Sequence, residues 1–194
     1  MINKISVCPS LLIFLCILMF ITGITNAPLS IMIDFIILYL SVFAHELGHA
    51  IIGLFFGYEV KKIKIVILGG IVEFTTKKWM SNPRHRFYIA AAGPVVNLII
   101  AMLFCTTHAF TLEINFLLAV FNLIPILPMD GGHIVIAVTE NYKLNGAVAP
   151  CIGIVSAIIA IGFFNVGFIG IVLLAMFIII NMSYILSGAG GTYE

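Results

Sequence analysis

The chain has 194 residues, of which 62% are hydrophobic and only 9% are charged, and its formal net charge is +1. A typical soluble domain is about 45–50% apolar and about 25% charged, so this chain lacks the polar residues that would cover a soluble surface. The composition therefore excludes a soluble enzyme, a disordered chain and a nucleic-acid-binding domain. It leaves a polytopic membrane protein, with the lipid bilayer as its surroundings.

Long apolar runs divide the chain into six predicted membrane spans. A spanning helix needs about 20 apolar residues, and such runs cover roughly residues 7–25, 31–56, 87–107, 112–127, 147–164 and 166–186. The first run also resembles a signal peptide, but it exceeds the usual apolar region of about 7–15 residues, and we interpret it as a retained span. We therefore expect an all-α polytopic membrane protein with a single domain over residues 1–194.

The basic residues predict how the spans are oriented. With six spans, the two termini and the segments 57–86 and 128–146 lie on one side of the membrane. All nine Lys and Arg fall on that side: Lys4, Lys61, Lys62, Lys64, Lys77, Lys78, Arg84, Arg86 and Lys143. Because cytoplasmic loops carry an excess of Lys and Arg, we expect both termini in the cytoplasm.

The segment between the second and third spans contains a pattern that is typical of β-strands. Polar and apolar residues alternate over residues 62–65 and again over 71–75, and Gly69 and Gly70 interrupt the alternation. This pattern predicts a small β-hairpin or sheet at the membrane surface. The alternative is a basic amphipathic segment that binds acidic lipid.

The second span carries the motif His45-Glu46-Leu47-Gly48-His49. Residues i and i+4 lie on one face of a helix, so two imidazoles can bind one Zn²⁺ while Glu46 acts as a general base. Ionisable side chains inside a membrane are costly unless they are partnered. A polar cluster that joins helices, or a proton path, is the alternative, and metal catalysis explains the spacing better.

A catalytic zinc site needs a third protein ligand and an open position. Pro125 and Pro128 break the fourth span, and Asp130 follows in an expected loop, from which it could turn inward. Asp130 is therefore the preferred ligand, and His133 is its rival on chemistry alone. The other candidates are His85, His108 and Glu140, and we expect the first two of these to be solvated.

Two separated motifs resemble a known family. The H-E-x-x-H motif in one span and N-x-x-P-x-x-P-x-D-G, which begins at Asn122, in a later one are similar to those of the site-2 proteases. These are intramembrane zinc metalloproteases. The resemblance covers about residues 30–140. It implies that His45, His49 and Asp130 bind one Zn²⁺ per chain, that Glu46 is the catalytic base and that Asn122 supports the active site.

Two further stretches fit the same resemblance. The residues Gly69, Gly70, Ile71 and Val72 resemble the family's glycine-bearing hairpin near the catalytic cleft, which implies a part in substrate binding. Residues 90–97, Ala-Ala-Ala-Gly-Pro-Val-Val-Asn, resemble its G-P-x-x-N segment. We interpret the latter as a kinked helix whose small residues allow close packing, without a catalytic role.

The resemblance implies a zinc metalloendopeptidase in a prokaryotic cell membrane. Its substrates would be transmembrane proteins, such as a membrane-tethered transcription or sigma factor, and a regulatory membrane partner is an open question. The compact chain with a basic hairpin and no PDZ domain looks like the sporulation branch, typified by the stage IV sporulation protease FB. Members of that branch often carry a C-terminal CBS domain, and the expectation of no CBS domain here is a departure from that pattern. The alternative function is a metal-ion or proton transporter that uses the same His, Glu and Asp residues.

Overall fold

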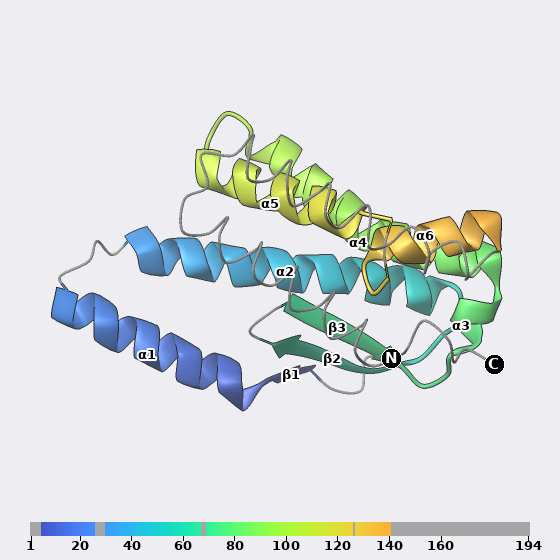
Figure 1. Ribbon diagram of the computed structural model, residues 1–194, viewed down its shortest axis with the longest axis horizontal. Coiled ribbons are helices and arrows are strands. Elements are labelled where there is room, and N and C mark those ends of the chain that lie inside the picture. The colour runs from blue at the N-terminus through green and yellow to red at the C-terminus, as the bar shows by residue number, and fades with distance from the viewer. Residues whose placement is uncertain (1–4, 26–29, 67–68, 126, 141–194) are drawn as a thin grey trace. The chain divides into compact units, whose positions relative to one another are not determined.

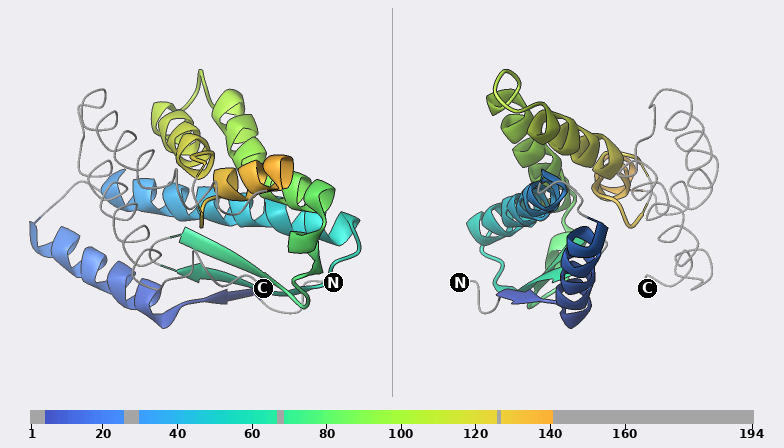
Figure 2. Two further views of the ribbon diagram at one scale, coloured as in Figure 1. Left: turned by 45° about the vertical axis from the view of Figure 1, so that its right-hand side comes forward. Right: turned by 90° about the vertical axis from the view of Figure 1, so that its left-hand side faces the viewer.

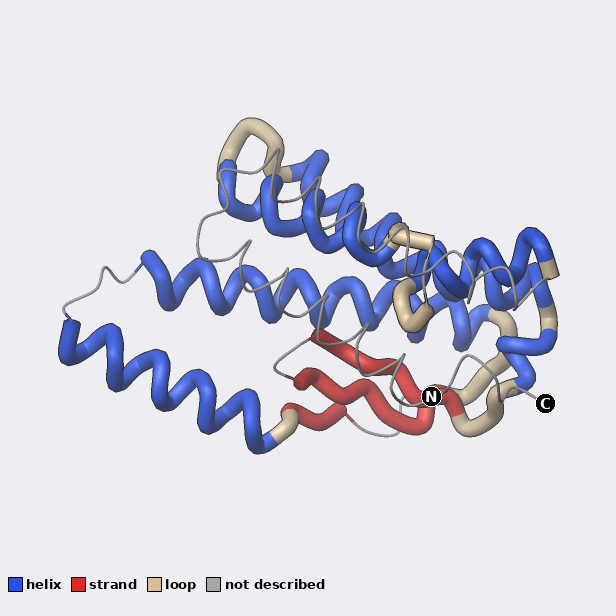
Figure 3. The backbone as a smooth tube through the Cα atoms, viewed as in Figure 1, coloured by secondary structure: helices blue, strands red, loops and turns tan. Residues whose placement is uncertain are grey.

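The computed structural model describes residues 5–25, 30–66, 69–125 and 127–140, which fall into two compact units, residues 1–120 and 121–194. Figure 1 labels the elements, and Figure 3 shows that helices predominate beside one small sheet. In chain order they are β1 (Ile5–Val7), α1 (Pro9–Thr25), α2 (Ser30–Phe55), β2 (Val60–Val66), β3 (Gly69–Phe74), α3 (Lys78–Ser81), α4 (Pro83–Leu103), α5 (Ala109–Asn122) and α6 (Asp130–Thr139).

Two of the described helices, α2 and α4, are long and apolar enough to cross a membrane. Two shorter apolar helices lie where the first and fourth spans are predicted. One is Leu11–Ile24, which is part of α1, and the other is α5. The predicted fifth and sixth spans lie outside the described residues, so the count of six stays a prediction.

The helix boundaries differ from the predicted span boundaries at both ends of α4 and α5. The start of α4 at Pro83, rather than at residue 87, follows from capping: Asn82 accepts a hydrogen bond from the His85 backbone N–H at 3.2 Å, and proline is favoured at the first helical position. The fourth span was expected over 112–127, but α5 ends at Asn122, before Pro125.

The end of α2 is fixed by a glycine in a left-handed conformation. Gly57 has φ of +81°. Its N–H bonds the Leu54 carbonyl at 2.9 Å, and the Tyr58 N–H bonds the Gly53 carbonyl at 2.9 Å. These two bonds form the Schellman motif, which satisfies carbonyls that a helix end would leave unpaired. The chain can therefore leave α2 and enter β2 within a few residues.

The predicted hairpin is confirmed, and a third strand joins it. The sheet has the order β1-β2-β3, with β1 parallel and β3 antiparallel to β2. The glycine pair was expected to interrupt the strands, but Gly69 and Gly70 instead begin β3 and pair with Val66 and Ile65. A register shift near Lys62 lets Val60 and Ile63 both be buried although they are three residues apart.

The first unit is built around α2. Figures 1 and 2 show the sheet along one side of this helix and α4 along the other. Side chains from α1, α2 and β2 pack together as a buried apolar cluster: Leu11, Val42, Ala50, Val60, Ile63 and Ile65. A polar contact also holds α2: the side-chain Nδ2 of Asn115 in α5 donates a hydrogen bond to Ser41 Oγ of α2 at 2.9 Å. Thus α2 is held by apolar contacts on one face and by polar ones on another.

In the second unit, a helix stands where a polar loop was expected. Asp130 is the first residue of α6 rather than part of a turn. A carboxylate in the first helical turn is favoured because the partial charge at a helix N-terminus is positive. The helix ends at Glu140, which has φ of +53° and donates its backbone N–H to the Ile136 carbonyl at 2.8 Å.

Candidate metal centre

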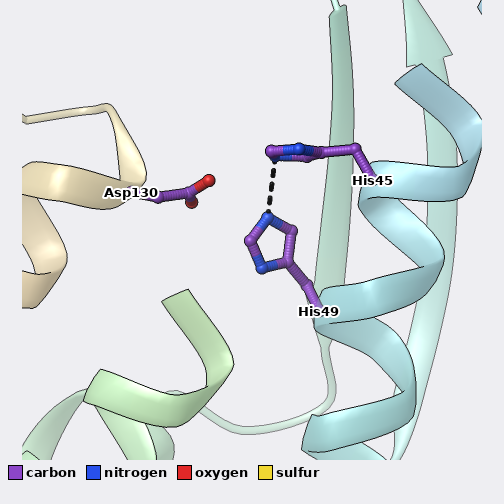
Figure 4. A group of neighbouring side chains, drawn as sticks. All are labelled: His45, His49 and Asp130. Carbon is purple, nitrogen blue, oxygen red and sulfur yellow. Dashed lines mark hydrogen bonds between the residues drawn. The ribbon is translucent and has the colours of Figure 1, made fainter. Parts of the chain in front are cut away.

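The two histidines of the H-E-x-x-H motif face one another on α2. They stand one helical turn apart, and their exposed fractions are only 6% and 8%. The Nε2 atoms of His45 and His49 are 3.1 Å apart, as the dashed line in Figure 4 shows. Two imidazole nitrogens at this separation can both reach a single ion at the Zn–N distance of about 2.0–2.1 Å.

The other nitrogen of each ring is held by α4. His49 Nδ1 donates to the Ile89 carbonyl at 2.6 Å, and His45 Nδ1 lies 3.0 Å from Asn97 Oδ1. A carbonyl can only accept, so His49 carries a proton on Nδ1 and turns Nε2 toward His45. Bonds of this kind fix the tautomer and the ring orientation of metal-binding histidines.

Gly93 of α4 lies directly against the two histidine rings. A side-chain Cβ at this position would stand 2.6 Å from His45 Nε2 and closer still to His49 Nε2, so only a glycine lets the rings pack here against α4. The separation of the two Nε2 atoms and their chemistry as nitrogen donors fit Zn²⁺, which prefers nitrogen, sulfur and carboxylate ligands.

Glu46 follows His45 directly and lies beside the sheet. Its side chain is 7% exposed. A Cβ on Gly70 of β3 would stand 2.7 Å from both Glu46 Cδ and Oε1, so the absent side chain of Gly70 makes room for the carboxylate. Glu46 points to another part of the helix surface than the histidines, because consecutive residues of a helix do not share a face. The role of Glu46 as a base remains a prediction.

Asp130, also labelled in Figure 4, is carried by α6 and belongs to the second unit. The same unit contains Asn122, the last residue of α5, and His133, which is one turn beyond Asp130 in α6. The roles of these residues remain predictions.

The remaining candidate histidines of the first unit have partners of their own. His85 was expected in a solvated loop, but it lies in the first turn of α4, where its Nδ1 is 2.6 Å from the Tyr58 hydroxyl. Its ring also stacks on Phe56 at 4.2 Å between centroids. His108 Nδ1 is 2.9 Å from Thr111 Oγ1, beside the start of α5.

Three contributions from α4 escaped the sequence analysis, which assigned residues 90–97 to packing alone. Ile89, Gly93 and Asn97 all face the histidine pair. Ile89 contacts it through its backbone carbonyl and Asn97 through its amide oxygen, and Gly93 lets the rings approach because it has no side chain. They are spaced four residues apart, as His45 and His49 are, so they share one helical face. That matching spacing was the available signal.

A buried histidine pair with an adjacent glutamate on an apolar helix defines the class of H-E-x-x-H metallopeptidases.

Known proteins support this classification. The model of peptidase family M50 matches residues 34–113 and 106–163. A candidate zinc metalloprotease of Synechocystis is 32% identical over 179 residues, which cover 83% of this chain and 47% of that protein. The stage IV sporulation protein FB of Bacillus subtilis is 31% identical over 108 residues, which cover 50% of this chain and 37% of that protein.

Among solved structures, the site-2 protease from Methanocaldococcus jannaschii has a TM-score of 0.66 at 24% identity, covering 94% of this chain and 91% of that one. This likeness establishes a shared fold.

The chain belongs to peptidase family M50, the family of the site-2 proteases. The resemblance seen in the motifs is thereby confirmed. The chain spans half or less of the length of the curated relatives described above. The sporulation branch stays a prediction, because the Synechocystis protein matches over a longer stretch than the sporulation protein does.

Proposed function

We propose that the chain is an intramembrane zinc metalloprotease that hydrolyses peptide bonds in or near the transmembrane segments of other proteins. The observation that carries this proposal is the pair of Nε2 atoms 3.1 Å apart, both buried within an apolar helix, with Glu46 buried beside them. A purely structural polar cluster has no need for two imidazole nitrogens turned toward one another at a separation that suits one shared ion. Family membership supports the same activity.

In this proposal His45 and His49 hold the ion, and Asp130 completes the set of protein ligands. A catalytic zinc site with two histidines and one carboxylate leaves one position open for water or substrate. Asp130 stands in the first turn of α6, where a carboxylate is favoured because the partial charge at a helix N-terminus is positive. The order of the two motifs along the chain also supports the assignment.

Zinc, when bound, acts as a Lewis acid and makes water a nucleophile at neutral pH. Glu46 takes the proton of the attacking water on its carboxylate and then delivers it to the leaving amine, as a general base and a general acid do. Asn122 is proposed to support the active site by donating a hydrogen bond from its amide to the reacting carbonyl oxygen.

The substrate is proposed to bind as an extended strand along β3. A transmembrane helix hides its amides in hydrogen bonds and must unwind before hydrolysis. In the described sheet β3 has β2 on one side and no strand on the other, so its outer edge can pair with an unwound segment. Gly70 lies against Glu46, and a strand added beside Gly69, Gly70, Ile71 and Val72 would therefore pass close to the proposed base.

The cut is proposed to fall in the cytoplasmic half of the substrate's span or just outside it. His49 and His45 lie six and ten residues before the end of α2 at Phe55, or roughly 9–15 Å along the helix at 1.5 Å per residue. The lysine-bearing hairpin follows that end directly. The positive-inside rule then places the histidine pair nearer the cytoplasmic surface.

The test uses the purified chain in proteoliposomes with single-span proteins as substrates. One substrate carries Gly and Pro in the cytoplasmic half of its span, and a matched one carries Leu there. The wild type should cleave the first faster, and mass spectrometry should locate the cut. Glu46→Gln and Asp130→Ala should abolish cleavage, whereas His133→Ala should retain it. A cut in the outer half, or full activity of Asp130→Ala, would contradict the proposal.

The same vesicles test the transporter alternative. A transporter would move zinc or protons across the bilayer and leave the substrates intact. Cleavage without zinc or proton flux supports the protease.

A further inference from the structure

The α4 helix supports the proposed metal centre by holding the two histidine rings, although it is not proposed to supply a ligand. Ile89, Gly93 and Asn97 form one helical face against the histidine pair. The backbone carbonyl of Ile89 accepts a hydrogen bond from His49, and Gly93 leaves room for both rings because it has no side chain. The remaining member, Asn97, is the one side chain of the three that touches a proposed ligand through a polar atom.

We propose that Asn97 is a positioning residue that holds the His45 ring with Nε2 turned toward the metal. This inference rests on the proposed zinc site and goes beyond it. The Oδ1 atom of Asn97 accepts from His45 Nδ1 at 3.0 Å. With the proton fixed on Nδ1, Nε2 keeps its lone pair for the ion. Without this bond the imidazole can rotate about χ2 or change its tautomer.

The bonding of Asn97 argues against a purely structural role. The residue is fully buried, with an exposed fraction of 0%. Its Nδ2 atom has no hydrogen-bond partner among the described residues. A buried donor without a partner destabilises a fold, so an apolar side chain here would suit folding as well or better. What Asn97 supplies is the acceptor for His45.

Asn115 provides a matched control in the same unit. It is also an asparagine with an exposed fraction of 0%. Its Nδ2 donates to Ser41 Oγ and to the Thr111 carbonyl, both at 2.9 Å, and so joins α5 to α2. Removal of Asn115 costs buried polar contacts of similar kind but leaves the partner of His45 in place.

The test measures zinc affinity of the full-length protein in detergent, by competition with a chromophoric chelator and without any substrate. Asn97→Leu should lower the affinity about 10- to 100-fold, the range for losing such a bond to a ligand. Asn97→Asp keeps the acceptor and should stay within a few-fold of the wild type. Asn115→Leu should also stay within a few-fold. If Asn97→Leu does not fold, Asn97→Ala takes its place.

A second readout is the thermal unfolding of the metal-free protein. Asn97→Leu should unfold at the same temperature as the wild type or higher, while Asn115→Leu should unfold at a lower one. Wild-type zinc affinity in Asn97→Leu, or equal weakening in Asn97→Asp and Asn115→Leu, would overturn the proposal. Since no step requires cleavage, an inactive wild type would refute the proposed function and leave this result to stand by itself.

Discussion

At the scale of single residues, two glycines determine what fits around the motif on α2. Gly93 faces the Nε2 atoms of His45 and His49, and Gly70 faces the carboxylate of Glu46. The two glycines come from different elements, α4 and β3. Each can be replaced by alanine to disturb one part of the site while leaving the other part in place, so metal binding and catalysis can be separated.

Gly93→Ala should lose the metal. The added methyl group would stand 2.6 Å from His45 Nε2 and closer to His49 Nε2, and would therefore displace the two imidazole rings from the positions in which they can share one ion. We expect zinc content to fall from about one ion per chain to near zero, measured by elemental analysis of the purified protein. Gly23→Ala in α1 is the control, because a Cβ there meets nothing within 4 Å. Full zinc content in Gly93→Ala would show that the ion lies elsewhere.

Gly70→Ala should keep the metal and lose activity. The methyl group would displace Glu46 from its place beside β3, and general-base catalysis contributes about 10²–10⁴-fold. We therefore expect kcat to fall at least about 100-fold with zinc content unchanged. Glu73→Gln, at an exposed position of the same strand, should retain activity. Loss of zinc in Gly70→Ala would mean that Glu46 itself holds the ion.

At the scale of the elements, the site depends on how closely α2 and α4 approach. A Cβ on Gly48 of α2 would stand 2.9 Å from the Ala92 carbonyl oxygen and from Val96 Cγ2 of α4. Small residues at such contacts let helix backbones come near one another in membranes. The same closeness brings the Ile89 carbonyl and the Asn97 amide within reach of the imidazoles.

Gly48→Ala should push the two helices apart. Overpacking in a tight contact typically destabilises by about 1–3 kcal/mol, so thermal unfolding of the metal-free protein should begin at a lower temperature. Gly23→Ala again serves as the control, and it should match the wild type or exceed its stability slightly. Equal stability of Gly48→Ala and the wild type would show that the helix contact is loose.

The sequence predicts the elements of this site better than their partners. The i, i+4 spacing of His45 and His49 and the alternation in residues 60–75 are local patterns, and both led to the right structure. The pairing of β1 with β2, by contrast, joins residues about 60 positions apart. The bond between His45 and Asn97 likewise spans 52 positions. No local pattern encodes a contact of that kind.

Some boundaries also required the folded structure. Residues 128–140 contain one proline and two glycines, which favour a loop, yet a helix begins at Asp130. The carboxylate in its first turn favours a helix start. In the sequence-based prediction, the two glycines that follow counted for more than this carboxylate, so a loop was expected. In the hairpin, Gly70 belongs to β3, where it pairs with Ile65, and its missing side chain leaves room for Glu46.

At the scale of the whole molecule, the proposed orientation in the membrane rests on the distribution of charge. All nine Lys and Arg fall on one side if six spans are present. The charged hairpin and the nearby end of α2 then face the cytoplasm. Water and the substrate's unwound segment would reach the histidine pair from that side.

Labelling of single cysteines tests this orientation. In a background without the four native cysteines, cysteines at Lys62 and Lys78 should react only with reagents that reach the cytoplasm. A cysteine at Phe110 should react from outside, because that position follows the third predicted span. The reverse pattern would overturn the orientation, and with it the proposed position of the cut.

The most direct test of the central claim is X-ray absorption at the zinc edge of the full-length protein in detergent. The ligand set proposed here predicts two imidazole nitrogens from His45 and His49, with only oxygen as the further ligands, all at about 2.0–2.2 Å. His49→Ala should remove one imidazole from the spectrum, Asp130→Ala should change the oxygen shell, and His133→Ala should change nothing. A third imidazole that disappears in His133→Ala, or a sulfur ligand near 2.3 Å, would contradict the proposed centre.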